Sequence, residues 1–471
     1  MRSRRLLILT SVAALVFGAC AAQPAATPSP SPSSAPTGGA SEVPATSTAP
    51  SGANAELTAA LAGDYEGATV EVMGQWIEAE GQAFDDSLKS FRDATGINVV
   101  YSGISNCETV LNVRVDGGLA PDVAQLAQAG NMRNFQQDGK LIDLGTVLDV
   151  EQLEQDFSPG FIDSGSVDGT LYGLYYKQDL KSIVWYPVKA FEAKGYEIPT
   201  TWDELVALSD RIVADGSNPW CTTIEHTDAS GWVATDWLED ILLRTAPVET
   251  YDKWVAHEIP FNDPAVLHAA ELMHKMWFTP DYVYGGSDRI NQTWVGDSQG
   301  PMFDKDGPKC WLHKQAAWIP DFWPKDENDE PLYKPGVDSS FFYFPPIDPQ
   351  YGNPVLGGSD MFVMFQDRPE VRAFIQWLST IDAVKDRVAT GAFLAANNSV
   401  PPEWYTSYPM SGLAEIARDA TVSRNDGSDA MPKEVGQGTF WKGMVKWVSQ
   451  NGEGTEAIFQ EIEDSWAALP S

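Results

Sequence analysis

The sequence predicts an α/β protein with two lobes, which follow an amino-terminal segment that does not join the fold. From residue 69 onward, strand-like apolar segments alternate with amphipathic helical segments. This alternation is typical of open sheets whose two faces are covered by helices. About 410 residues follow the amino-terminal segment, which is more than one hydrophobic core usually organises, so we expect two lobes.

Residues 1–19 have the pattern of a secretory signal. Three arginines among the first five residues precede an apolar run at 6–17, which has the length of a signal h-region and is too short to span a bilayer. Gly18 and Ala19 then precede Cys20, an ending that resembles a bacterial lipobox, in which the cysteine becomes the lipid-modified first residue. The alternative is an ordinary signal peptide with a chance cysteine.

Residues 20–64 are expected to form a disordered tether. The stretch from Cys20 to Asn54 contains seven prolines, many small polar residues and Glu42 as its one charge. Such a composition can neither bury a core nor sustain a helix. We therefore expect the folded part to be held close to a membrane by its anchor.

The net charge excludes some classes of partner. The chain has a formal charge of −35, and loss of the three signal arginines leaves 28 basic against 66 acidic residues, or −38. Nucleic acid and anionic lipid are repelled by such a surface. No apolar run after the signal reaches the length of a membrane span. We therefore expect an exported, well-cored protein that touches the membrane only through its anchor.

The cysteines predict one disulfide bond. With Cys20 assigned to the lipid, Cys107, Cys221 and Cys310 remain, and an odd number allows at most one bond. Cys221 and Cys310 both lie in stretches rich in Pro and Trp, whereas Cys107 begins an amphipathic segment. We expect a Cys221–Cys310 bond and a buried free thiol at Cys107. The five histidines show no metal-ligand spacing, so we expect neither a metal nor a cofactor.

The first part of the fold reads as β-α-β-α-β. Strands are predicted at 68–76, 97–103 and 119–127, with helices at 78–95 and from 107 between them. Ligands of such sheets bind beyond the carboxyl ends of the strands.

Later segments continue the α/β pattern. A long β-rich run at 169–187 precedes a helix at 199–216, which Thr200 or Thr201 caps and Gly216 ends, with Glu204 at capping-box distance from Thr201. Further helices are predicted at 234–246, 263–278 and 368–381, the first of them amphipathic, and a strand containing a Gly pair is predicted at 353–365.

Several stretches, in this order, resemble the sugar-binding proteins of ABC importers, the class that contains maltose-binding protein. The stretches include "FRDATGINVVY", "APDVAQLAQAGNMRNFQQDGKLIDL", "SIVWYPVKAFEAKGYEIPTTWDELVAL", "LGGSDMFVMF" and "MPKEVGQGTFWKGMV". The most similar members are α-glucoside-binding lipoproteins. The resemblance implies a periplasmic-binding-protein-like fold with a hinge of crossing segments and a cleft between two α/β lobes, formed by 65–179 with 356–400 and by 180–355 with 401–471.

The same resemblance implies a function. The protein would capture a sugar by hinge closure on the outer face of the bacterial cytoplasmic membrane and deliver it to the permease of an ABC importer. It would act as a monomer, without catalysis and without a cofactor.

A neutral sugar is bound by aromatic faces and by fixed carboxylates or amides. Glu78 follows the first strand, where maltose-binding protein has an aspartate, although acidic residues there are also ordinary at a helix start. Either Trp318 or Phe322 is expected to supply an aromatic platform, and Lys177 or Lys181 could bind ligand or lie at an edge. The full set of candidates is Trp76, Glu78, Glu80, Gln125, Gln128, Lys181, Glu225, Trp232, Asp236, Trp318, Gly358, Asp360 and Trp441.

Trp441 is the candidate with the most specific local pattern. "MP", a short polar gap and "FW" at a helix start match the stretch in which maltose-binding protein has a stacking tryptophan. Phe440 and Trp441 could instead both be core residues. Neighbouring helical residues point about 100° apart, so one of the two can face the cleft.

Two other functions are compatible with the composition. Tryptophans and carboxylates also serve exported glycoside hydrolases, although no pair of carboxylates is fixed here at catalytic separation. The acidic balance would also suit a protein of the same fold that binds a polyamine or another cation.

Overall fold

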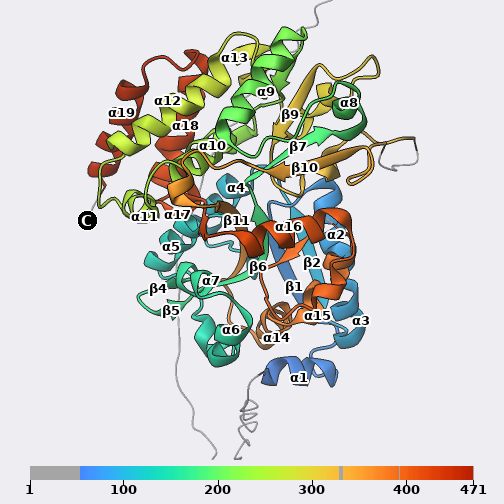
Figure 1. The fold of residues 1–471 in the computed structure, drawn as a ribbon. Helices are drawn as coiled ribbons and strands as arrows, with labels where there is room; N and C mark the ends of the chain where they lie inside the picture. Colours follow the sequence, from blue (N-terminus) through green and yellow to red (C-terminus); the bar gives the residue numbers. More distant parts are fainter. Residues whose placement is uncertain (1–53, 328–331, 392, 470–471) are drawn as a thin grey trace, which may run out of the picture. The chain divides into compact units, whose positions relative to one another are not determined.

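The computed structural model describes residues 54–327, 332–391 and 393–469, which are organised around a larger and a smaller mixed sheet (Figure 1). The larger sheet has the strand order β12-β6-β11-β3-β1-β2, and β13 pairs with the first part of β11; the smaller sheet has the order β10-β7-β9-β8. The predicted signal, Cys20 and most of the predicted tether lie outside the described residues.

The strands are short except for β11. Those of the larger sheet are β1 Thr69–Gly74, β2 Asn98–Gly103, β3 Val123–Leu126, β6 Gly173–Leu180, β11 Pro354–Met364, β12 Leu394–Ala395 and β13 Val422–Asn425. Those of the smaller sheet are β7 Ile183–Pro187, β8 Asn218–Trp220, β9 Cys310–Lys314 and β10 Ser339–Tyr343, and a separate hairpin consists of β4 Ser166–Val167 and β5 Thr170–Leu171.

The helices cover these sheets. In the first half of the chain they are α1 Ala55–Leu61, α2 Glu78–Ser87, α3 Lys89–Thr95, α4 Cys107–Asp116, α5 Ala129–Gln137, α6 Val150–Asp156, α7 Pro159–Ser164, α8 Val188–Ala193 and α9 Trp202–Ala214. In the second half they are α10 Trp232–Leu243, α11 Val248–Val255, α12 Pro264–Phe278, α13 Gly286–Gln292, α14 Pro369–Leu378, α15 Ile381–Ala389, α16 Tyr408–Asp419, α17 Gly427–Ala430, α18 Trp441–Ser449 and α19 Thr455–Ala467.

Separate hydrophobic cores serve the two sheets. One core contains residues between 60 and 176 and between 361 and 400, and it packs under the larger sheet. Two others contain residues between 180 and 356 and again between 394 and 466. The boundaries of the two lobes stay a prediction.

The long β-rich run at 169–187 divides at a crossing between the two sheets. β6 ends at Leu180 in the larger sheet and β7 begins at Ile183 in the smaller one. Backbone N–H of Lys181 donates to Leu356 O at 2.9 Å, and Leu356 N–H donates to Ser182 Oγ at 2.8 Å. The crossing is therefore fastened to β11, the strand in the middle of the larger sheet.

Three local expectations differ from the structure. The expected tether at 20–64 includes the helix α1, whose Leu57 N–H donates to Gln376 of α14 at 2.8 Å, because the Ala-rich stretch can bury its small side chains. The expected helix at 78–95 is divided into α2 and α3 at Leu88. Helix α10 is buried on nearly every side instead of being amphipathic.

Other expectations are confirmed. Thr201 Oγ1 accepts from Glu204 N–H at 3.3 Å and Glu204 Oε2 accepts from Thr201 N–H at 3.2 Å, which is the predicted capping box. Cys221 and Cys310 form the disulfide bond, and Cys107 is free and buried. Among the described residues, no helix combines the length and the apolar character needed to cross a membrane.

We expect the Cys221→Ala/Cys310→Ala double variant to lose about 2–5 kcal/mol of unfolding free energy, because the bond closes a loop of 89 residues in the unfolded chain. Urea unfolding of both proteins measures this difference. The parent is unfolded with its disulfide bond intact, and the variant is unfolded under non-oxidising conditions. An unchanged unfolding free energy would show that the bond does not hold the smaller sheet together.

Candidate functional site

A cavity of about 1020 Å³, including the part open to solvent, lies beyond the ends of β1, β3 and β6. Its aromatic lining residues are Trp76, Trp232, Trp294, Trp318, Phe322 and Trp441. Its acidic lining residues are Glu80, Glu108, Asp179, Asp360, Asp426 and Asp429, and its basic ones are Lys177, Lys181 and His226. The lining residues come from β6 and β11 and from helices and loops far apart in the sequence.

Most of the predicted site residues meet in this cavity. Those that line it are Trp76, Glu80, Gln128, Lys181, Trp232, Trp318, Gly358, Asp360 and Trp441. Trp318 and Phe322 both line it, so the choice between them was unnecessary.

Four predicted residues do not line the cavity. Glu78 is exposed at the start of α2 and lines a separate surface groove. Glu225 accepts a hydrogen bond from Thr227 N–H at 2.9 Å. Gln125 and Asp236 are buried behind the cavity wall, where each holds a residue that does line it. Their positions give Gln125 and Asp236 a supporting role and place Glu78 and Glu225 elsewhere.

Lys177 is the centre of the first charged cluster. It is 2% exposed, and its Nζ lies 2.7 Å from Glu80 Oε1, 3.0 Å from Asp179 Oδ2 and 3.8 Å from Asp360 Oδ2. Burial lowers the pKa of Lys177, but the three carboxylates together hold it above its ordinary value. The lysine is thus charged and already paired, and the carboxylates outnumber it.

Asp360 is held by donors from the first strand and its neighbour. Its Oδ1 accepts from Gln125 Nε2 at 2.7 Å and from Gln75 Nε2 at 3.0 Å, and its Oδ2 accepts from Trp76 Nε1 at 3.2 Å. Burial raises the pKa of Asp360 to about 7, although Lys177 opposes this. The Trp76 ring itself packs against Phe84 in the core, so the indole serves mainly to position Asp360.

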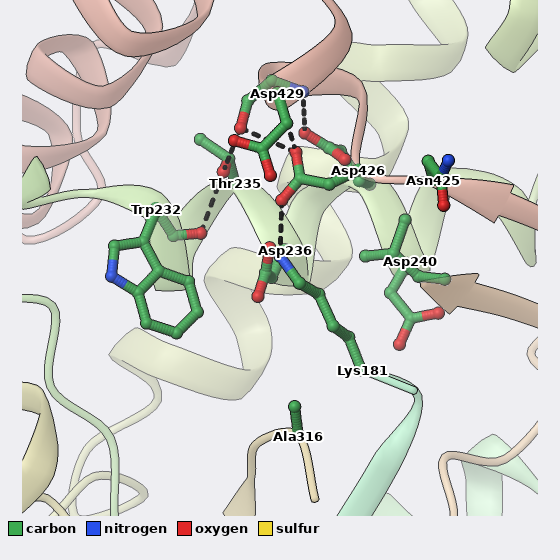
Figure 2. A network of polar contacts seen from close by, with 12 residues as sticks. Lys181, Trp232, Thr235, Asp236, Asp240, Ala316, Asn425, Asp426 and Asp429 are labelled. Carbon is green, nitrogen blue, oxygen red and sulfur yellow. Dashed lines mark hydrogen bonds and ion pairs between the residues drawn. The ribbon is translucent and has the colours of Figure 1, made fainter. Parts of the chain in front are cut away.

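Lys181 is the centre of the second charged cluster, which Figure 2 shows. It follows β6 directly and reaches toward α10 and the start of α17, where its Nζ lies 2.8 Å from Asp236 Oδ1 and 2.6 Å from Asp426 Oδ2. Burial and the charge of Asp426 hold the pKa of Asp236 well above its ordinary range, while Lys181 keeps the pKa of Asp426 low. Asp426 is therefore the charged partner of Lys181.

The same cluster holds the start of α17. Asp426 Oδ1 accepts from Ser428 Oγ at 2.7 Å and from Asp429 N–H at 3.1 Å. Glu239 of α10 accepts from Gly427 N–H at 2.6 Å and from Ser428 N–H at 2.9 Å. Asp429 lines the cavity, and burial together with the charge of Asp426 raises its pKa. The second cluster thus also has more carboxyl groups than cations.

The aromatic wall begins at Trp232, the first residue of α10. Trp232 Nε1 donates to His226 Nδ1 at 3.2 Å, and Lys181 Nζ lies 5.4 Å from the centre of the Trp232 ring. The Trp318 ring lies 6.0 Å from that of Trp232 and 5.6 Å from that of Phe322. Adjacent ring faces of this kind suit the C–H surfaces of a flat, hydroxylated ligand.

Trp441 joins this wall from another helix. It is 3% exposed, lines the cavity and donates from Nε1 to Ser428 Oγ at 3.2 Å, whereas Phe440 is fully buried in the core. Gly231, at φ 114°, precedes α10, and a Cβ there would lie 2.3 Å from Trp441 O. Glycine at this position therefore lets the two tryptophan-bearing helix starts approach each other.

The two walls touch at the rim of the cavity. Thr109 Oγ1 of α4 donates to Asp228 Oδ2 at 2.6 Å, and Arg133 Nη1 of α5 donates to Ala430 O of α17 at 2.6 Å. A Cβ on Gly130 would lie 1.9 Å from Met431 O, so glycine is required for this approach. The two walls are therefore in direct contact at these points.

Sequence reasoning missed several lining residues, namely Glu108, Asp179, His226, Trp294, Asp426 and Asp429. Asp179 had a usable signal, because it alternates with Lys177 and Lys181 along one face of a strand. Asp426 precedes a Gly in an N-cap pattern. Glu108 and Trp294 have no local signal, since their role depends on which distant segments face them.

We expect Lys181→Met to destabilise the fold by about 3–5 kcal/mol, because it leaves buried carboxyl groups without their cation. The loss should be smaller at pH 5 than at pH 7.5. The pKa of Asp236 is already raised, and without the lysine the buried carboxyl groups bind protons in the folded state. Acid therefore stabilises the folded variant, and this stabilisation is lost as the pH rises. Urea unfolding at both pH values measures this.

Lys189→Met is the matched control for that variant. Lys189 is 73% exposed and pairs with Asp338 at the surface, so its loss should cost less than about 1 kcal/mol at either pH. Equal losses for both lysine variants would contradict the central position of Lys181.

Comparisons with known proteins agree with this architecture. Residues 74–385 match the family model described as bacterial extracellular solute-binding protein. Over 86% of this chain and 94% of its own length, the osmoprotective compounds-binding protein GgtB of Synechocystis sp. is 40% identical. The alpha-glucosides-binding periplasmic protein AglE of Rhizobium meliloti is 37% identical over 86% of this chain and 88% of its own length.

Solved structures share the fold at low identity. The bacterial solute receptor AcbH superposes with a TM-score of 0.71 at 18% identity, covering 84% of this chain and 98% of its own. Maltose-bound MalE3 of T. maritima superposes with a TM-score of 0.66 at 17% identity, covering 86% of this chain and 100% of its own. The two-lobed fold of periplasmic binding proteins is thereby confirmed, and the chain belongs to the family of bacterial extracellular solute-binding proteins.

Proposed function

We propose that the cleft binds an uncharged sugar, an α-glucoside or another small oligosaccharide, and that the protein delivers it to the permease of an ABC importer. The observation that carries this proposal is a cavity lined by several aromatic rings together with surplus carboxyl and amide acceptors. The name of the relative AglE, an alpha-glucosides-binding protein, supports the same class of ligand.

The proposed roles follow from the positions of the side chains. Trp232, Trp318 and Trp441 would stack against C–H faces of the sugar, since all three line the cavity. Glu80 and Asp360 would accept hydrogen bonds from hydroxyl groups, since each has two oxygens and lies beside the cavity. Lys177 would mainly fix these two acceptors, and Lys181 would fix Asp426, because the charges of both lysines are neutralised by carboxylates.

The pairing of both lysines also sets the charge of the ligand. A phosphorylated or carboxylated sugar would bring a negative charge to a cavity whose carboxyl groups outnumber its cations. An uncharged sugar adds no charge and uses the free lone pairs. The surplus of carboxyl groups is also the observation that favours the second candidate, a cationic solute such as a polyamine.

Binding would proceed by closure of the cleft. The ligand contacts would come from both walls, so a sugar would favour the closed form by the difference of its affinities for the two forms. The crossing at Lys181 and Ser182 would be part of the hinge, because it leads from one sheet to the other beside β11. The lobes would be formed by 65–179 with 356–400 and by 180–355 with 401–471.

The protein would act as a monomer held at the outer face of the membrane by a lipid on Cys20. The basic start, the apolar run and the Gly18-Ala19-Cys20 ending motivate this proposal. We expect the mature protein to partition into detergent and its Cys20→Ser variant to remain unprocessed or be released. Mass spectrometry of the mature amino terminus checks it, and a first residue other than Cys20 would exclude a lipid anchor.

The ligand class can be tested by thermal-shift screening with maltose, sucrose and trehalose, with glucose 1-phosphate and glucuronic acid, and with spermidine and choline. A ligand that binds only the folded state raises the melting temperature. We expect a shift from at least one of the three neutral sugars, none from the anionic sugars and no release of glucose. A shift from the cations alone, or turnover of a disaccharide, would contradict the proposal.

The same experiment, followed by calorimetry, tests the aromatic wall. Trp441→Ala should weaken binding of the responding sugar about tenfold, since a tryptophan face on a sugar contributes about 1–2 kcal/mol. Trp404→Ala is the control, because Trp404 is a partly buried tryptophan that does not line the cavity. It should change stability and leave affinity unchanged.

A further inference from the structure

One wall of the cleft carries polar groups that the internal contacts do not use. Gln128, at the start of α5, is 4% exposed and lines the cavity. Its Nε2 donates to Glu108 Oε1 at 3.4 Å, but among the described residues its Oε1 has no hydrogen-bond partner. A buried amide oxygen without a partner is unfavourable, so a group from outside the chain is expected to satisfy it.

Glu108 lies next to this oxygen, in the first turn of α4, and lines the same cavity. Within the described chain, no Lys, Arg or His forms an ion pair with it. The neighbouring titratable groups are Asp228, across the cleft, and Cys107, which precedes it. Burial, followed by the charge of Asp228, raises the pKa of Glu108 to about 7.

The cations near this wall are engaged elsewhere or neutral. Lys433 Nζ lies 3.4 Å from Asn112 Oδ1, one turn along α4 from Glu108. His226 lines the cavity, and burial holds its pKa below the ordinary value, so its imidazole carries no charge at pH 7 and above. Lys181 is bound to Asp236 and Asp426. Among the described residues, therefore, no cation pairs with Glu108, and the side-chain donor that contacts its carboxyl group is Gln128 Nε2.

We propose that Glu108 and Gln128 form a subsite for one hydroxyl group of an uncharged ligand, in which the Glu108 carboxyl group donates to the hydroxyl oxygen and Gln128 Oε1 accepts the hydroxyl hydrogen. This proposal rests on the proposed function. A hydroxyl group has a single hydrogen and cannot donate to two acceptors at once. A carboxyl group that keeps its proton gives the hydroxyl one donor and one acceptor.

Binding then takes up a proton at Glu108. In the open cleft the Glu108 carboxyl group binds protons with its ordinary affinity. In the closed, occupied cleft it binds them more tightly. Affinity is thus greatest in acid and falls as the pH rises from about 4.5 to about 7, after which it levels off. Asp360 contributes in the same direction, since its pKa is raised as well. The contribution of Glu108 is therefore the difference in pH dependence between the parent and the Glu108→Gln variant.

Calorimetry with maltose, sucrose and trehalose at pH 5.5 and pH 8, each in two buffers of different ionisation enthalpy, tests the subsite. The parent should bind the responding sugar at least about tenfold more weakly at pH 8 than at pH 5.5. Glu108→Gln should bind within about threefold of the parent at pH 5.5, because an amide replaces the donating acid, and its pH dependence should be clearly smaller than that of the parent, since only the contribution of Asp360 remains. Its proton uptake on binding near pH 6 should fall by more than about half a proton.

Two further variants complete the experiment. Gln128→Leu should weaken binding about tenfold at both pH values while the melting temperature of the ligand-free protein stays equal or rises, because the unpartnered oxygen is removed. Asp116→Asn is the matched control, since it removes a carboxylate from the exposed end of the same helix. It should behave as the parent does.

Each other outcome overturns a defined claim. An unchanged pH dependence in Glu108→Gln, loss of its binding at pH 5.5, or full affinity in Gln128→Leu overturns the subsite and leaves the sugar-binding function standing. Spermidine or choline bound more tightly at pH 8 than at pH 5.5, with that preference lost in Glu108→Gln, shows an ionised Glu108 facing a cation and also overturns it. If neither the parent nor Asp116→Asn binds any of the three sugars, the proposed function fails and the subsite fails with it.

Discussion

The pairing of two lysines with a surplus of carboxyl groups is the interaction on which the cleft depends. Lys177 and Lys181 lie four residues apart along one strand and its continuation, so their side chains leave the same face. Lys177 joins β6 to α2 and β11, and Lys181 joins the crossing to α10 and α17. Charges buried in this way are tolerated only when they are paired and hydrogen-bonded. The two lysines thus hold together the floor of the cavity and the segment that connects the sheets.

The two walls of the cleft have different chemistry. The wall from the smaller sheet and its helices supplies most of the aromatic rings, with Trp232, Trp318 and Trp441 at its centre. The opposite wall supplies carboxyl and amide groups, including Glu80, Glu108 and Gln128. A ligand that contacts Trp232 or Trp441 and also Glu80, Glu108 or Gln128 would touch both walls, and such contacts would favour closure.

Much of the fold could be predicted because its signals are local. The capping box at Thr201 and Glu204, the strand β11 and the pairing of Cys221 with Cys310 follow from residue types within short stretches or from a count of cysteines. The errors arose where local patterns are ambiguous. The helix α1 has a composition between those of a linker and a helix. Helix α10 is polar along one side yet buried, because Lys181, Lys314 and Arg244 pair with Asp236 and Asp240, and backbone N–H groups of α17 donate to Glu239.

By itself the sequence determined the α/β class, the family and the residue types available for a ligand, because periodicity, capping and motif order are properties of neighbouring residues. The tertiary structure alone decided which of those residues meet. Glu78 and Glu80 are two positions apart, yet one is exposed outside the cavity and the other pairs with Lys177. Glu108 carries no signal at all, and it matters only because Gln128, Asp228 and the closed cleft surround it. Burial and pairing depend on segments hundreds of residues apart, which no local pattern encodes.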